Sequence, residues 1–187
     1  MKLFSQEVKD MNELNEVLKN SNEVSKDYEV AVIVYAFDSE NKIVFQRRGL
    51  GCRDEQLKLE TIGGRVKKSD INFRTALQRE ITEEIGTDAH IELQEFIVST
   101  YAKTFDVRNN KEQDWIYLVY KGNLKSGELK IAEPNKCLGY ERYKIGEVDK
   151  NELSNGAREL YNIVSEKYSY LKWYGGNQIM KIIAGWC

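Results

Sequence analysis

The chain has 187 residues, of which 41% are hydrophobic, and its 28 Lys and Arg against 30 Asp and Glu leave a formal net charge of −2. This balance excludes a strongly basic nucleic-acid-binding protein, and the hydrophobic share excludes a disordered chain. No uncharged stretch approaches the ~20 apolar residues that a membrane-spanning helix needs. We therefore expect one globular domain over residues 1–187, with neither a membrane nor a nucleic acid as its partner.

The cysteines and the single histidine narrow the chemistry further. Cys52, Cys137 and Cys187 are widely spaced, and no two of them stand at a zinc-ligand spacing. The N-terminus reaches Glu7 before an apolar run can build, unlike a signal peptide. These features predict a reduced chain in the cytoplasm. His90 is the only histidine, so it would have to carry any Ser-His-Asp or Cys-His catalysis alone, and we interpret it as an ordinary surface or strand residue.

The first part of the chain predicts a short helix followed by a β-hairpin. Residues 8–18 carry apolar side chains at helical spacing, and residues 28–37 are rich in β-branched and aromatic residues, as in a buried strand. The polar residues 38–42 predict a turn, with residues 43–47 as the hairpin partner. Residues 57–62 alternate weakly and predict a strand that Gly63 and Gly64 end.

The second part predicts further helices and strands around a central helix. That helix covers residues 70–86, with Ser69 or Asp70 as its N-cap and Gly86 as its C-terminal stop. Further strands are predicted at 91–100 and 115–120, short ones at 128–131 and 139–145, a long helix at 151–171, and another helix after Gly176. This order predicts an α/β sandwich on a mixed sheet, with an N-terminal helical segment (1–25), a core (26–148) and a C-terminal helical segment (149–187).

Three glutamates of the central helix suggest a metal site. Glu80, Glu83 and Glu84 fall within an arc of roughly 100°, because successive helical residues turn by about 100°. Glu80 and Glu84 also continue the apolar stripe that Phe73 and Leu77 begin, so they stand at the edge of a buried face and need compensating charge. Clustered carboxylates favour a hard cation, Mg²⁺ or Mn²⁺. The alternative is a solvated acidic face with no function.

The neighbouring residues fit the same interpretation. Arg79 precedes Glu83 by four residues and can hold its carboxylate in place. The pair Gly63 and Gly64 precedes the helix and would allow close approach of the backbone to a metal or a phosphate. A plain turn is the alternative interpretation of the two glycines.

These residues resemble the signature of the Nudix hydrolases. The segment Arg79-Glu80-Ile81-Thr82-Glu83-Glu84-Ile85-Gly86 matches the second half of the family box, and Gly64 matches its opening glycine. The sequence departs from the box in three ways: it is one residue longer, Asp70 stands where the family has Glu, and Thr87 replaces the closing aliphatic residue. The resemblance implies a Nudix-like α/β/α sandwich and metal-dependent hydrolysis of a nucleoside diphosphate linked to another moiety.

The resemblance also implies roles for individual residues. Glu80, Glu83 and Glu84 look like ligands of Mg²⁺ or Mn²⁺, with Gly64 at the same metal site, and Arg79 looks like the residue that orients them. The general base is one of these glutamates or a residue outside the box, for which Glu112 is the candidate. The departures leave the role of Asp70 open.

Substrate-binding residues are expected outside the box. Arg47, Arg48 and Arg53, together with Gly63, are candidates for contacts with the phosphates, although arginines at such positions can also serve solubility alone. Four aromatic residues, Tyr101, Phe105, Trp115 and Tyr117, are candidates for stacking on a base. For Trp115 and Tyr117 we favour a place in the core of the sheet.

Three other functions remain open at this stage. One is a ligand-sensing domain that binds a nucleotide and has lost hydrolysis. A second is an isomerase of isoprenoid diphosphates, which is disfavoured because Cys52 has no histidine near it in the sequence. A third is a purely structural acidic helix. The expected partner is a small nucleotide-type diphosphate, and a homodimer is compatible with the resemblance.

Overall fold

The computed structural model describes residues 1–21, 23–106 and 110–169. Its elements in chain order are β1 (Lys2–Phe4), α1 (Met11–Leu18), β2 (Tyr28–Phe37), β3 (Lys42–Arg48), β4 (Leu59–Glu60), β5 (Ile62–Arg65), α2 (Phe73–Ile85), β6 (His90–Asp106), β7 (Lys111–Ser126), β8 (Cys137–Lys144) and α3 (Asn155–Ser169). In this part of the chain no helix is both long and apolar enough to cross a bilayer.

The strands form one mixed sheet, as predicted. Its order is β1-β6-β7-β2-β3-β4, with β5 paired to β2 and β8 paired to β3. Strand β2 runs parallel to β7 along its whole length, from Tyr28 opposite Asp114 to Phe37 opposite Asn123, whereas the other named pairs are antiparallel. The other edge of β2 is shared, since β5 pairs with residues 31–34 and β3 pairs at Phe37.

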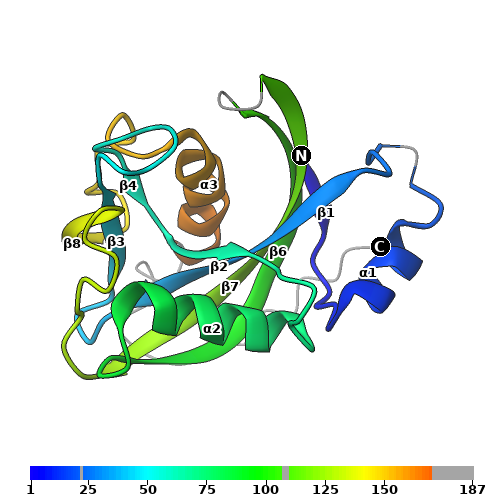
Figure 1. The fold of residues 1–187 in the computed structure, drawn as a ribbon. Helices are drawn as coiled ribbons and strands as arrows, with labels where there is room; N and C mark the ends of the chain where they lie inside the picture. The colour runs from blue at the N-terminus through cyan, green and yellow to red at the C-terminus, as the bar shows by residue number, and fades with distance from the viewer. Residues whose placement is uncertain (22, 107–109, 170–187) are drawn as a thin grey trace.

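Each face of the sheet is covered by one helix, which makes the α/β/α sandwich (Figure 1). Side chains alternate along β2, so Val32 and Val34 pack with α2 while Ile33 and Tyr35 pack with α3. All four are less than a tenth exposed. The predicted α/β/α sandwich on a mixed sheet is confirmed.

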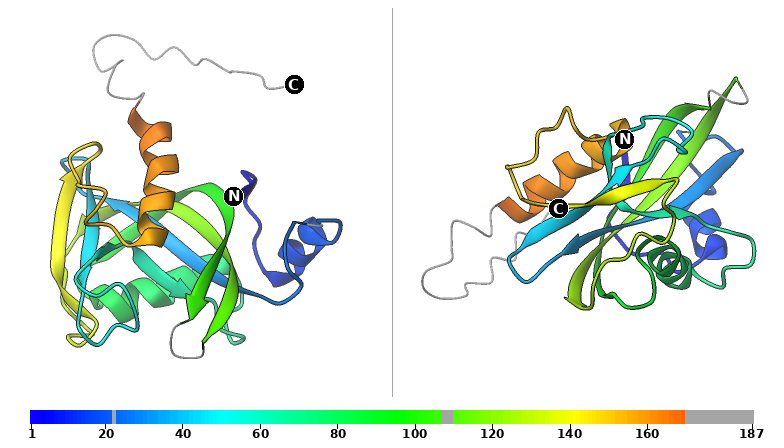
Figure 2. Two further views of the ribbon diagram at one scale, coloured as in Figure 1. Left: turned by 90° about the horizontal axis from the view of Figure 1, so that it is seen from above. Right: turned by 60° about the vertical axis from the view of Figure 1, so that its left-hand side comes forward.

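Several element bounds differ from the sequence-based predictions. Helix α2 begins after the N-cap Asn72, whose side chain forms a capping box with Thr75, rather than at Ser69 or Asp70. The predicted strand at 128–131 is absent, and the long helix begins at Asn155. Strands β6 and β7 continue well past the predicted ends into a long hairpin that projects from the body (Figure 2). The helix predicted after Gly176 lies outside the described residues.

Strand β5 corrects the prediction that two glycines end a strand. Gly63 and Gly64 lie inside β5, opposite Ile33 and Val32 of β2. Gly63 has a φ of +146°, which residues with a Cβ rarely adopt, so the glycine lets the ladder continue where another residue would break it. This extension places the glycine pair beside α2.

The cysteines and the histidine have ordinary surroundings. Cys52 and Cys137 are free thiols, and Cys187 lies outside the described residues. His90 begins β6 with an exposed side chain, as the sequence suggested.

Candidate active site

The glycine pair of β5 lies directly against two glutamates of α2. The backbone N–H of Gly63 donates a hydrogen bond of 2.9 Å to Oε2 of Glu84. A Cβ on Gly64 would lie 2.5 Å from Oε2 of Glu80, so only glycine leaves room for that carboxylate. The two contacts hold both acidic side chains at the junction between the sheet and the helix.

Glu84 is a buried carboxylate with two hydrogen-bond donors and two other glutamates near it. Its Oε1 accepts a 3.0 Å hydrogen bond from Nε2 of Gln46, a buried residue of β3. Burial raises the pKa of Glu84 to about 8, the hydrogen bonds from Gln46 and Gly63 offset part of this rise, and the negative charges of Glu80 and Glu60 add a smaller rise. A cation near these carboxylates would therefore be stabilised.

Arg79 is the centre of an ion-pair network on the other side of Glu80. Its guanidinium contacts Glu80 at 2.6 Å and Glu83 at 3.2 Å, so the contact predicted from the Arg79–Glu83 spacing is present. It also makes two hydrogen bonds to Asp70, of 3.0 and 2.7 Å, and one of 3.1 Å to the carbonyl of Arg65. The fork of five N–H donors in a guanidinium suits such a set of oxygens.

The Asp70 carboxylate holds the lengthened loop to the helix. Its side chain is only 7% exposed, and Oδ2 also accepts a hydrogen bond from the backbone N–H of Lys67 at 2.8 Å. The bonds from Arg79 hold the pKa of Asp70 below its ordinary value. Asp70 therefore anchors Arg79 rather than capping α2.

We expect Asp70→Asn to lower the free energy of unfolding at pH 7 by about 2 kcal/mol, the range for a buried charged hydrogen bond. Because the folded-state pKa of Asp70 is lowered, its contribution is present above the unfolded pKa of ~3.9 and is lost as pH falls through the lower folded value. Urea unfolding at pH 7 and at pH 3 measures this difference, which should shrink at pH 3. Asp88→Asn, at an exposed aspartate that pairs with Lys130, is the control and should hardly change stability. A deficit for Asp70→Asn that is the same at both pH values would contradict the assignment.

The donors around the glycine pair fit a hard divalent cation. Within the described ranges no three acidic, cysteine or histidine side chains converge as a ready-made metal cage. Arg79 contacts both Glu80 and Glu83, and Lys67 contacts Glu83 at 3.0 Å. The oxygen donors are nevertheless those that Mg²⁺ and Mn²⁺ prefer, and the negative charges of Glu80 and Glu60 lie near the buried carboxylate of Glu84.

A cleft of about 540 Å³ adjoins the glycine pair on the α3 side of the sheet. It is lined by β2, β4 and β5, by the loop after β3, by the start of α3 and by the β6–β7 hairpin. Arg48 and Arg53 line both this cleft and a smaller pocket of about 240 Å³ that holds Gln46 and Glu84. The two arginines thus lie between the acidic residues of α2 and the larger cleft.

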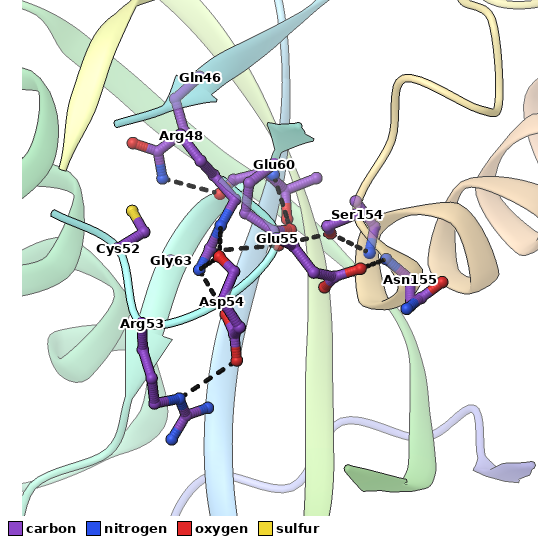
Figure 3. Close-up of polar contacts among 12 residues, drawn as sticks. Gln46, Arg48, Cys52, Arg53, Asp54, Glu55, Glu60, Gly63, Ser154 and Asn155 are labelled. Atoms are coloured by element: carbon purple, nitrogen blue, oxygen red, sulfur yellow. Dashed lines mark hydrogen bonds and ion pairs between the residues drawn. The ribbon is translucent and has the colours of Figure 1, made fainter. Parts of the chain in front are cut away.

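Polar contacts fix the arginine-bearing loop (Figure 3). Arg48 donates to Oδ1 of Asp54 at 2.7 Å and to the carbonyl of Asp54 at 3.0 Å, and Arg53 pairs with the same carboxylate at 3.2 Å. Glu55 of this loop accepts a 2.7 Å hydrogen bond from the backbone N–H of Asn155 at the start of α3. The loop therefore bridges β3 and α3 across the cleft.

Glu60 is a site residue that the sequence analysis missed. Its carboxylate lines the cleft, accepts a 2.6 Å hydrogen bond from the hydroxyl of Ser154, and lies 3.7 Å from Arg48. Burial raises the pKa of Glu60 above its ordinary value. The sequence carries only a weak signal for Glu60, namely the alternation of side chains in a short predicted strand.

Two predicted site residues lie apart from the cleft. Arg47 pairs with Glu141 and Glu152, each at 2.7 Å. These ion pairs hold the guanidinium of Arg47 away from the cleft that Arg48 lines. Glu112 is exposed in the hairpin and is not among the residues that line the cleft.

The four aromatic candidates also divide between those that line the cleft and one that does not. Trp115, Tyr117 and Phe105 line the cleft, whereas the hydroxyl of Tyr101 donates to Asp114. Tyr117 packs against the core on the α3 side while it also lines the cleft, so the expected core position holds in part for Tyr117, whereas Trp115 lies in the cleft wall and in neither core cluster.

Comparisons with known proteins agree with this geometry. The family model described as NUDIX domain matches residues 27–163. No curated protein matches the chain in sequence. Three similar solved structures are a MutT NUDIX hydrolase from Burkholderia pseudomallei (22% identity, TM-score 0.58, covering 74% of this chain and 99% of that one), a MutT protein from Methanosarcina mazei Go1 (15%, 0.61, 78% and 98%), and the NUDIX domain of Shewanella oneidensis NrtR complexed with ADP ribose (13%, 0.55, 81% and 96%). At these identities the structural likeness establishes the fold.

Proposed function

Because the chain belongs to the Nudix family and is a hydrolase of acid anhydrides in phosphorus-containing compounds, we propose that it hydrolyses a nucleoside diphosphate linked to another moiety, with Mg²⁺ or Mn²⁺ as cofactor. The observation that carries this proposal is that Gly63 donates a hydrogen bond to Glu84 while Gly64 lies against the carboxylate of Glu80. These contacts place the glycine-lined wall of the cleft next to the carboxylates of α2.

In this proposal Glu80, Glu83 and Glu84 hold the cation, together with the backbone carbonyl of Gly64. When bound, the cation supplies positive charge to the diphosphate oxygens and acidity to water. Arg79 fixes the carboxylates of Glu80 and Glu83 through its contacts with both. The ion pairs with Arg79 and Lys67 hold the carboxylates of Glu80 and Glu83 in place. Each carboxylate keeps further lone pairs with which it can bind a cation.

The remaining roles belong to residues of the cleft. Arg48 and Arg53, between the carboxylates and the cleft, bind the phosphates, and the backbone at Gly63 allows close approach. Glu60 is our candidate for the general base in place of Glu112, because Glu60 lines the cleft and burial raises its pKa, which makes its carboxylate a stronger base. Ser154 positions this carboxylate by its hydrogen bond.

A panel of nucleoside diphosphate compounds, assayed by phosphate release after phosphatase treatment, tests the proposal. We expect turnover of at least one compound with Mg²⁺ or Mn²⁺, its loss with EDTA, and its recovery when excess cation is returned. Turnover that EDTA leaves unchanged would contradict the cation requirement. Nucleotide binding without any product over hours would instead favour the ligand-sensing alternative.

A further inference from the structure

We propose that Cys52 and Cys137 form a reversible oxidation site, in which hydrogen peroxide joins the two thiols in a disulfide and thereby lowers the activity of the neighbouring site. Only the effect on activity rests on the proposed function, because the disulfide can form whether or not the chain hydrolyses a diphosphate. The two cysteines, called here the thiol pair, line the pocket of about 240 Å³ that also holds Gln46 and Glu84.

Backbone contacts bring the thiol pair together from distant parts of the chain. Cys137, the first residue of β8, lies opposite Arg48 at the end of β3. Beyond Arg48 the chain turns back on itself, since the N–H of Cys52 donates to the carbonyl of Gly49 at 3.1 Å. The carbonyl oxygen of Lys136 accepts hydrogen bonds from the N–H of Gly49 at 2.6 Å and from the thiol of Cys52 at 3.2 Å. Cys52 is therefore held against the residue that precedes Cys137.

Glycine at two positions lets the loop after β3 approach so closely. A Cβ on Gly49 or on Gly51 would lie 2.5 Å from the carbonyl oxygen of Asn135. The N–H of Gly51 also donates to that oxygen, at 2.8 Å. The loop that carries Cys52 is thus packed directly on the segment before β8, and a larger residue at either glycine would push the thiol pair apart.

The sulfur of Cys52 needs only a short movement to bond with Cys137. It lies 3.2 Å from the carbonyl oxygen of Lys136, and the planar peptide group places that oxygen about 3 Å from the Cα of Cys137. The sulfur is therefore at most about 6 Å from that Cα. In a disulfide of ordinary geometry each sulfur lies about 3–4.5 Å from the Cα of its partner. The difference is small enough for side-chain rotation within the pocket to close it.

The different exposure of the two thiols sets the order of the reaction. Cys52 is partly exposed, whereas Cys137 is 3% exposed and burial raises the pKa of its thiol. The sulfur of Cys52 therefore attacks hydrogen peroxide first. A sulfur–oxygen bond forms, the O–O bond breaks, and the leaving hydroxide takes the thiol proton, which gives a sulfenic acid and one water.

The second step consumes the sulfenic acid. The sulfur of Cys137 attacks the sulfur of Cys52, so that the S–S bond forms and the S–O bond breaks, and the leaving hydroxide takes the proton of Cys137 as a second water. The two thiols are oxidised by two electrons in total, and the peroxide is reduced to two waters. Two equivalents of a small thiol reverse the bridge by exchange and are themselves oxidised to a disulfide.

The bridge restrains the loop that carries the proposed phosphate contacts. Arg53 follows Cys52 directly, and Arg48 stands opposite Cys137 in the ladder. The far side of the loop is already fixed, since Glu55 accepts a hydrogen bond from the start of α3. A disulfide at Cys52 fixes the near side as well, so the two arginines lose the freedom to adjust to a substrate.

Mass spectrometry tests the thiol pair without any measurement of activity. Cys187→Ser leaves Cys52 and Cys137 as the only cysteines of the chain. After treatment with hydrogen peroxide, unfolding in an alkylating reagent should give a monomer that is two hydrogens lighter and carries no alkyl group. Dithiothreitol should then restore two alkylated thiols. A monomer that still takes two alkyl groups, or oxidation that gives only linked dimers or sulfinic acid, would overturn the proposal.

Two serine variants in the same background check the order of the steps. Cys137→Ser should stop at the sulfenic acid of Cys52, which dimedone traps as an increase in mass. Cys52→Ser should keep the thiol of Cys137 reduced at the same dose of peroxide, because that thiol is buried. Oxidation of Cys137 in Cys52→Ser as fast as in the parent chain would overturn the assigned roles.

Kinetics on a substrate from the panel test the effect on activity. The oxidised Cys187→Ser chain should lose about 10-fold or more in kcat/KM and regain it with dithiothreitol, whereas Cys52→Ser should keep its activity through the same treatment. Full activity of the bridged chain would refute the regulatory effect. A bridge in a chain that hydrolyses nothing in the panel would uphold the thiol pair while the proposed function failed, and hydrolysis by a chain that forms no bridge would show the reverse.

Discussion

Glu83→Gln should lower kcat/KM by about 10³-fold, which corresponds to ~4 kcal/mol of transition-state stabilisation, while the melting temperature changes little. Glutamine keeps the size of the side chain but removes the charge that the proposed cation requires. The effect on stability is small because Glu83 is 43% exposed, and its pairs with Lys67 and Arg79 are the kind that contribute little to folding. Steady-state kinetics with saturating Mg²⁺ and a thermal melt of the same preparation measure both quantities.

Glu92→Gln is the matched control for this variant. Glu92 pairs with Lys125 at 3.0 Å, as Glu83 pairs with Lys67, and the two glutamates have similar exposure. The control should keep full activity. If Glu83→Gln also retained full activity, the carboxylate would have no role in catalysis.

Gly63→Ala and Gly64→Ala should separate folding from catalysis. At Gly64 the backbone is not strained, and the new methyl would meet only the mobile end of Glu80, at 2.5 Å from Oε2. The carboxylate must then move by about an ångström, and a misplacement of that size can cost about 10²-fold in rate. We therefore expect Gly64→Ala to lose about 10²-fold in kcat/KM with a small change in stability.

Gly63→Ala should instead destabilise the fold. Its Cβ would lie 2.2 Å from the carbonyl oxygen of Val32 in the neighbouring strand, and its φ of +146° is strained for alanine. We expect a loss of about 3 kcal/mol or more, seen as a drop in melting temperature of roughly 6–12 °C. Calorimetry and kinetics on both variants measure the contrast. Equal melting temperatures for the two would show that the strand does not need glycine at position 63.

The parts of the fold that depend on local sequence patterns were predicted correctly. Strand β2 has the predicted bounds, because its β-branched and aromatic run is buried on both faces. The C-terminus of α2 was also predictable, since Gly86 adopts the positive φ of 81° that favours glycine at a helix end. The contact of Arg79 with Glu83 followed from helical spacing alone.

Predictions were wrong where several residues suited a position equally well and tertiary contacts decided which of them occupies it. Ser69, Asp70 and Asn72 are all good N-cap residues, and Asn72 takes the position while Arg79 binds Asp70. Arg47 and Arg48 are chemically identical, and only their tertiary surroundings assign one to an ion pair with Glu141 and the other to the cleft. These outcomes depend on residues far away in the chain, which a single sequence does not show.

The candidate site was predictable to the extent that it lies on one helix. Glu80, Glu83 and Glu84 share a face by geometry, so their clustering needed no knowledge of the fold. Glu60 and Ser154 meet only because α3 returns to β4, and neither residue carries a local signal of function. The cleft is therefore the part that the sequence analysis described least well.

The parallel pairing of β2 with β7 also constrains the order in which the chain folds during its synthesis. Residues 28–37 cannot complete their ladder until residues 114–123 have left the ribosome, which takes several seconds at ordinary rates of synthesis. Contacts of such high sequence separation slow folding, because loop closure costs entropy before the pairing repays it. Since β5 pairs with β2, the strand that bears the glycine pair rests on a ladder that stays incomplete until β7 has been synthesised.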